Sequence, residues 1–253
     1  MPGPRMAVVR AEWTKLWTVP GTLLLLIVAA ATTVAVAVLA VATETCPEPE
    51  CGVAAMLTGV RLGQAVIAIV AVLMISDEYR TGLIRLTFAA VPNRSGVLAA
   101  KAGVLTVVLT VTAAVAVLGS LLGGRLVLPG RGYAAPSLAD GEVARAVGGS
   151  VLYLVLIGLL GLGAGTLLRS PAGAIGTVLG LIYVVPIMAA AAPDPKWERR
   201  LQQIGPMDAG LAIQKTGDLA GLPVQPWHGL GVLVLWAAGA LVLAGVLLHQ
   251  RDA

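Results

Sequence analysis

Charged residues are scarce in this sequence. Asp, Glu, Lys and Arg make up 12% of its 253 residues, whereas a soluble domain carries about 25%. Hydrophobic residues make up 58%, and the mean hydropathy is +0.91. The few charges form short bands between long apolar runs, with no room for a soluble domain. This composition excludes a soluble protein and predicts a membrane protein made of spanning helices.

A nucleotide-binding loop is also missing. A Walker loop requires G-x-x-x-x-G-K-[ST], because backbone amides and a lysine must surround the phosphates, and no glycine here is followed by a lysine. We therefore predict that this chain is not an enzyme and binds no cofactor itself. The run GLLGLGAG at 158–165 lies in an apolar segment and favours helix packing. The same small-xxx-small spacing joins Gly119 to Gly123, Gly161 to Gly165, and Gly176 to Gly180.

Histidine and deeply placed ionisable groups are rare too. The two histidines, His228 and His249, flank the last apolar run without a metal-binding spacing such as H-E-x-x-H, so no metal site is predicted. No Asp, Glu or Lys lies deep within an apolar run, where an ion-coupled transporter is expected to keep such groups. This absence disfavours ion-coupled transport.

Six apolar runs are long enough to cross a bilayer, which takes about 20 helical residues. The fold class is therefore all-α, a polytopic membrane protein with six transmembrane helices. The predicted spans are 19–42, 62–76 with an alternative start at 53, 102–123, 147–168, 172–192 and 228–248. They form one transmembrane domain over 1–253. Its first half consists of an interfacial helix (1–18), spans one and two (19–76) and a connecting segment (77–101). Its second half consists of spans three to five (102–192), an external loop (193–227), and span six with its tail (228–253).

Both cysteines lie in the first loop between spans, TETCPEPECG at 43–52, which has no Lys or Arg. In an oxidising compartment Cys46 and Cys51 would form a disulfide. Two free thiols, or a Cys/Glu metal site, are the alternatives. Together with a slight excess of Lys and Arg on the N-terminal side, this loop predicts that both termini are cytoplasmic and that the protein is multi-pass in the cell (inner, cytoplasmic) membrane.

The segment before the first span has a helical apolar pattern. Its apolar face would hold Met6, Val9, Trp13, Leu16 and Trp17. The polar residues elsewhere on this helix are Arg10, Glu12, Thr14 and Lys15. The pattern predicts a helix lying in the inner interface with its tryptophans at headgroup depth. The alternative is a positive-inside anchor that contacts no partner.

The connecting segment 77–101 is also patterned as an amphipathic helix. Its apolar stripe would consist of Tyr79, Leu83, Leu86 and Ala90. The charged residues on its other faces are Asp77, Glu78, Arg80 and Arg85. Pro92 would end this helix, and Arg94 and Lys101 would mark the return to the membrane. The alternative is a solvated loop at the anionic inner leaflet.

Two further features concern the second half of the chain. In the external loop, Trp197, Leu201 and Ile204 predict a short amphipathic helix, and Leu211 with Ile213 predicts a second short element. A plain surface loop is the alternative. Pro186 is expected to kink the fifth span.

Two segments resemble the permease subunits of ABC transporters of the ABC-2 type, particularly those of actinobacteria. They are RAEWTKLWTVPGT at 10–22 and EYRTGLIRLTFAAVPNRSGVLAAK at 78–101. Family members carry in the second segment a Glu, an aromatic residue, Gly-Thr, a hydrophobic helix, Pro, a basic residue and Ala-Lys. The matching residues here are Glu78, Tyr79, Gly82, Pro92, Arg94, Ala100 and Lys101. Leu83 stands where the family usually has Thr.

The resemblance implies a permease dimer, homomeric or heteromeric, above two ABC ATPase subunits that bind ATP and magnesium. Within the cytoplasmic coupling segment 77–101, residues 78–94 resemble the coupling helix that sits on the ATPase, and residues 5–18 resemble the connecting helix beside it. The residues implied in ATPase coupling are Glu78, Tyr79, Arg80, Gly82, Leu83, Arg85, Leu86, Pro92 and Arg94. The interfacial-helix residues are Arg10, Trp13, Lys15 and Trp17.

In this scheme each residue class has an expected role. Tyr79, Leu83 and Leu86 would pack against the ATPase; Glu78, Arg80 and Arg85 would form ion pairs with it. Gly82 would allow helices to approach closely. The chain is then interpreted as the permease of an exporter for an amphipathic or hydrophobic small molecule, lipid or peptide, acting by alternating access within the lipid bilayer. The alternatives are a membrane scaffold or immunity-type protein without transport activity, and an ion-coupled secondary carrier. No nucleic-acid partner is expected.

Overall fold

A computed structural model describes residues 4–18, 20–43, 49–91, 93–129 and 136–250. Within these ranges the chain consists of helices joined by turns and contains no strand, so the predicted all-α class is confirmed. The predicted disulfide lies outside the described residues, because Cys46 and the side chain of Cys51 are not among them.

Among the residues that the structure describes, six helical segments are long and apolar enough to cross a membrane. They are Pro20–Thr43 (α2), Gly52–Thr81 (α3, Pro49–Leu57, with α4, Val60–Thr81), Arg94–Val127 (α6), Gly141–Leu168 (α7), Pro171–Ala190 (α8, Pro171–Leu179, with η2, Gly180–Val184, and α9, Val185–Ala190) and Pro226–Gln250 (α12). This confirms the six predicted spans and a multi-pass membrane architecture.

The third span begins earlier than the sequence pattern predicts. The Asn93 side chain accepts a hydrogen bond from the Gly96 N–H at 2.9 Å, which caps the helix at its first turn. Helix α6 therefore starts at Arg94 rather than near Ala102. Lys101 consequently lies inside a helix that continues into the membrane span.

Helix α7 is the centre of the bundle and packs against α4, α6 and α12. Its glycines permit this contact, since a Cβ at Gly161 would lie 2.9 Å from the carbonyl oxygen of Ala68 in α4. Gly165 lies against Val72 and Ile75 of α4 in the same way, and Gly119 and Gly123 lie against α2. The packing role predicted for the pairs Gly119/Gly123 and Gly161/Gly165 is confirmed. Gly176 and Gly180 face open space within the described chain.

The fifth span contains an irregular turn. Residues Gly180–Val184 form a π-helical turn, and Pro186 follows directly at the start of α9. Proline removes a backbone donor, and π-turns are a recognised cause of helix bending. The irregular turn thus lies directly before Pro186, and the kink expected at Pro186 itself stays a prediction.

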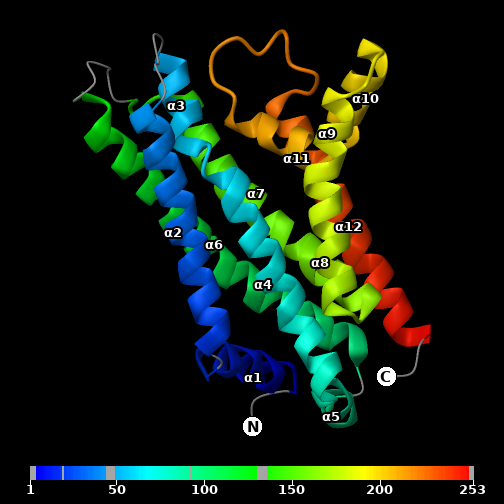
Figure 1. Cartoon of the computed structure of the whole chain (residues 1–253). Coiled ribbons are helices and arrows are strands. Elements are labelled where there is room, and N and C mark those ends of the chain that lie inside the picture. Colours follow the sequence, from blue (N-terminus) through cyan, green and yellow to red (C-terminus); the bar gives the residue numbers. More distant parts are fainter. Residues whose placement is uncertain (1–3, 19, 44–48, 92, 130–135, 251–253) are drawn as a thin grey trace.

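Short helices cover one end of the bundle, which we call the α3/α10 end (Figure 1). Helix α10 (Pro195–Ile204), helix α11 (Pro206–Leu211) and the 3-10 turn η3 (Ala212–Gln214) follow α9. Both elements predicted in the external loop are confirmed. Residues of α11 are largely buried, and α11 with η3 packs against α12.

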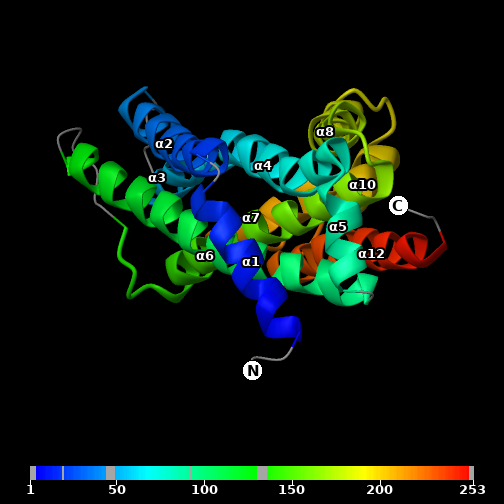
Figure 2. The same ribbon diagram turned by 90° about the horizontal axis from the view of Figure 1, so that it is seen from below.

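The opposite end carries α1 (Pro4–Thr18) and α5 (Leu83–Ala90), and we call it the α1/α5 end. Helix α1 lies across the bundle there, packed against α6 and α2 (Figures 1 and 2). The described chain begins and finishes toward this end, at Pro4 and Gln250. This arrangement agrees with an even number of spans.

Candidate functional site

The connecting segment 77–101 holds the end of α4, the whole of α5 and the start of α6, rather than the single amphipathic helix predicted before Pro92. Helix α4 ends at Thr81, and Gly82 adopts the left-handed conformation with φ 71°, its N–H donating to the Tyr79 carbonyl. Helix α5 then begins at Leu83. A glycine favours such a turn because a Cβ is strained at positive φ. Among the described residues of this chain, no helix closely approaches Gly82, since nothing lies within 4 Å of a Cβ built there.

The break at Gly82 also divides the predicted apolar stripe. Leu83 and Leu86 are 47% and 68% exposed on α5, at the extremity of the α1/α5 end (Figure 1). Tyr79 is instead partly buried, with the guanidinium of Arg169 5.2 Å from its ring centroid. The surface that α5 offers to a partner is therefore the pair Leu83 and Leu86, with Arg85 also exposed beside them.

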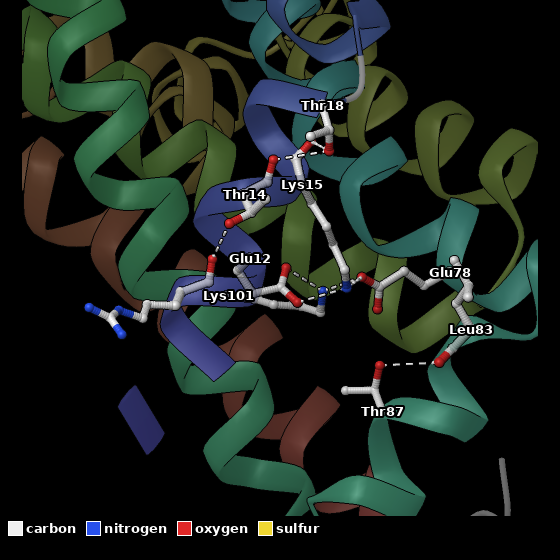
Figure 3. Close-up of polar contacts among 9 residues, drawn as sticks. Glu12, Thr14, Lys15, Thr18, Glu78, Leu83, Thr87 and Lys101 are labelled. Carbon is white, nitrogen blue, oxygen red and sulfur yellow. Dashed lines mark hydrogen bonds and ion pairs between the residues drawn. The ribbon is translucent and has the colours of Figure 1, made fainter. Parts of the chain in front are cut away.

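Four charged side chains meet beneath this surface (Figure 3). Lys101 Nζ lies 2.6 Å from Oε1 of Glu78 and 2.7 Å from Oε2 of Glu12. Lys15 Nζ lies 2.7 Å from Oε1 of Glu78 and 3.0 Å from Oε1 of Glu12. We call Glu12, Lys15, Glu78 and Lys101 the charge cluster. Its two acids and two bases balance, so the cluster carries no net charge.

Burial makes the charge cluster energetically important. Lys101 is 1% exposed, Glu12 3% and Glu78 6%, so three of the four charges are removed from water. Charges in a low-dielectric region are stable only when paired, and losing one partner of a buried pair costs about 3–5 kcal/mol. Burial by itself would lower the pKa of Lys15, but hydrogen bonding and attraction from Glu78 and Glu12 outweigh that effect and raise this pKa above 10.5.

The charge cluster joins three helices. Glu12 and Lys15 come from α1, Glu78 from α4 and Lys101 from α6. The expected role of Glu78 as an ion-pairing residue for an ATPase is therefore corrected, because its carboxylate is buried and bound to two lysines of its own chain. Glu12 was expected on the polar face of the interfacial helix, but its side chain is buried in the bundle, and Lys15 beside it is half-buried. Val9 and Trp13, from the predicted apolar face, are 41% and 43% exposed.

Sequence reasoning missed Glu12 and Lys101 as site residues. A lysine followed by a long apolar run was a usable signal, since an ionisable group that enters a span needs a partner. The two acids that pair with Lys101 are Glu12 and Glu78, which are 89 and 23 residues away in the sequence, so local periodicity could not identify them.

The remaining predicted residues are spread around this end. Arg94 donates from Nη1 to the Leu248 carbonyl at 2.8 Å, which caps the last turn of α12. Arg80 is exposed and pairs with Asp77 at 3.5 Å, and Arg10 is exposed on α1. Pro92 and the side chain of Trp17 lie outside the described residues.

A cavity of about 400 Å³ opens beside the charge cluster between α1, α2 and α4. Lys15 and Glu78 line its polar part, and Leu25, Leu73 and Met74 line its apolar part. Such a lining suits a molecule with one polar and one apolar end. In the part of the chain that the structure describes, no group of three or more His, Cys, Asp or Glu side chains could hold a metal ion.

Neither a protein-family model nor a curated protein sequence matches this chain.

Proposed function

We propose that this chain is the membrane-spanning permease subunit of an ATP-driven exporter and that a separate ATPase docks on α5. The observation that carries the proposal is the exposed pair Leu83 and Leu86 on α5. This short helix lies outside the six spans and connects the second span to the third. An exposed apolar pair rimmed by charges is typical of a protein contact. In this proposal the α1/α5 end faces the cytoplasm.

The charge cluster gives this docking surface a mechanical connection to the membrane. Helix α5 is joined to α4 through Gly82 and to α6 through residues 91–93. Glu78 and Lys101 bind α4 to α6. Lys15 of α1 binds Glu78 of α4, and Glu12 of α1 binds Lys101 of α6. A displacement of α5 would therefore move the three helices together. A movement driven by ATP binding could thus be transmitted to the spans as a rigid-body rotation.

The cavity beside the charge cluster supports an amphipathic substrate. It lies where α2 and α4 meet α1, with a polar part at Lys15 and an apolar part along the spans. A molecule that partitions into the inner leaflet holds its polar end at the membrane surface and its apolar chain among the lipid tails. Its polar end would therefore meet Lys15, and its apolar chain would lie along the spans. We infer that export begins from this side of the membrane.

One observation favours a second candidate, an ion-coupled carrier. The buried Glu12, Glu78 and Lys101 are the kind of ionisable groups that such carriers keep inside the protein. Here they are paired with one another at one end of the bundle. Transport into proteoliposomes separates the two mechanisms: ATP with a partner ATPase drives an exporter, and a proton or sodium gradient alone drives a carrier.

Affinity purification from the native membrane tests the docking proposal. The tagged wild-type chain should recover a protein that hydrolyses ATP, and Leu86→Asp should lose it because a carboxylate replaces an apolar contact. Leu126→Asp is the matched control, since Leu126 is 84% exposed in the last turn of α6 at the opposite end. A stable wild-type chain that recovers no ATPase, or equal recovery with Leu86→Asp, would contradict the proposal.

A further inference from the structure

A second, smaller cavity lies at the α3/α10 end, away from the charge cluster. Its volume is about 190 Å³, and it is a half-open hollow lined by the start of α4, by α10, α11 and η3, and by the loop before α12. Its lining includes Arg61, Gln202, Asp208, Lys215 and Val224. Arg61 and Lys215 are exposed at its rim.

The backbones of the two basic residues are firmly held. The Arg61 carbonyl accepts hydrogen bonds from the Tyr183 hydroxyl at 2.5 Å and from Gln64 Nε2 at 3.0 Å. The Lys215 carbonyl accepts one from Arg145 Nη2 at 2.5 Å, and its N–H donates to Ala212. Both side chains therefore start from fixed positions, on different elements, beside the same cavity.

The cationic groups of both side chains lack a hydrogen-bond or ion-pair partner among the described residues. Neither the Arg61 guanidinium nor the Lys215 ammonium forms a hydrogen bond or an ion pair with any residue that the structure describes. A guanidinium carries five donors and an ammonium three, and both are strong anion ligands when unpaired. Two such groups lining one small cavity constitute a site for negative charge.

Asp208 is the third charged residue in the lining of the cavity. Burial raises the pKa of its carboxyl group, and the nearby Arg61 opposes that rise. With Asp208 ionised, the three residues sum to one positive charge. The rest of the lining consists of the polar Gln202 and the apolar Leu211, Ala212, Leu222, Pro223 and Val224.

We propose that this cavity binds an anionic group, a carboxylate or a phosphate, borne by a small molecule or a lipid headgroup. Arg61 and Lys215 would contact the anion from two sides, and Leu211 and Val224 would contact an adjoining apolar portion. The volume is smaller than the several hundred Å³ usual for a drug-sized ligand, which fits a single headgroup. The site does not depend on the proposed ATPase partner.

Calorimetric titration of the purified full chain in uncharged detergent tests the site. The probes are dodecyl phosphate, inorganic phosphate, and dodecanol as the uncharged control. Arg61→Gln and Lys215→Gln should each weaken phosphate binding by at least about tenfold, since each removes a charged hydrogen-bond donor. Asp208→Asn should instead tighten it, because a repelling charge is removed.

Matched controls are available on α10, where Arg199→Gln and Lys196→Gln remove the same charges from exposed positions outside the cavity. These two variants should bind as the wild type does. Binding of dodecyl phosphate alone would identify an amphipathic ligand, and binding of inorganic phosphate as well would identify a free anion. Absence of binding, or equal losses in the control variants, would overturn the proposal.

Discussion

The Lys101 ammonium lies 2.6 Å from the Glu78 carboxylate, although the two residues are 23 positions apart in the chain. Between them the chain leaves the bundle to form α5 and returns into α6. This ion pair therefore joins the two ends of the segment that carries the exposed Leu83 and Leu86. Because Glu12 of α1 binds the same ammonium at 2.7 Å, these two ends are also bound to a third helix.

Removing the central cation should destabilise the protein strongly. Lys101→Met leaves the buried carboxylates of Glu12 and Glu78 with only Lys15 as a partner. We expect the free energy of unfolding, measured by denaturant titration in micelles, to fall by about 3–5 kcal/mol. The exposed Lys196→Met should change it by less than about 0.5 kcal/mol.

A double variant distinguishes a lost ion pair from a general packing defect. Lys101→Met combined with Glu78→Gln removes both partners, so fewer unpaired charges remain buried. The combined loss should be smaller than the sum of the two single losses by about 1–3 kcal/mol. Strict additivity would show that Glu78 and Lys101 do not interact.

Sequence periodicity predicted a helix before the first span and exposed leucines between the second and third spans, but could not say what these helices contact. The six spans and the helix α10 follow from local patterns and were predicted. The partners of Lys101 come from α1 and α4, so their meeting depends on the tertiary arrangement. An acid on a polar helix face looks the same in a sequence whether it meets water, a partner protein or a buried lysine.

The break at Gly82 could have been predicted. A glycine inside a helical pattern is a signal for a C-cap, and the break separates Tyr79 from Leu83 and Leu86.

We expect Gly82→Ala to lower the free energy of unfolding by about 1 kcal/mol, because alanine is strained at φ 71°. The matched control is Gly103→Ala, at an open helical position, where the change should be neutral or stabilising by up to about 1 kcal/mol. An equal loss in both variants would contradict the left-handed turn.

The contribution of Lys15 should depend on pH only in the alkaline range. Its pKa in the folded protein is raised above 10.5, so its stabilising effect is complete below that value and disappears as the pH rises through the folded pKa. The difference in melting temperature between the wild type and Lys15→Met should be constant at pH values below the ordinary lysine pKa and shrink only as the pH rises through the raised pKa of Lys15. A difference that vanishes near neutral pH would contradict the pairing with Glu78 and Glu12.

Photo-crosslinking from α5 tests the central claim most directly. A photoreactive benzoylphenylalanine is placed at position 86 or, as the control, at position 126 at the opposite end, and the chain is irradiated in its native membrane. The account predicts that position 86 captures an ATPase carrying a Walker motif and that position 126 does not. Failure to capture an ATPase from position 86, or equal capture from both positions, would contradict it.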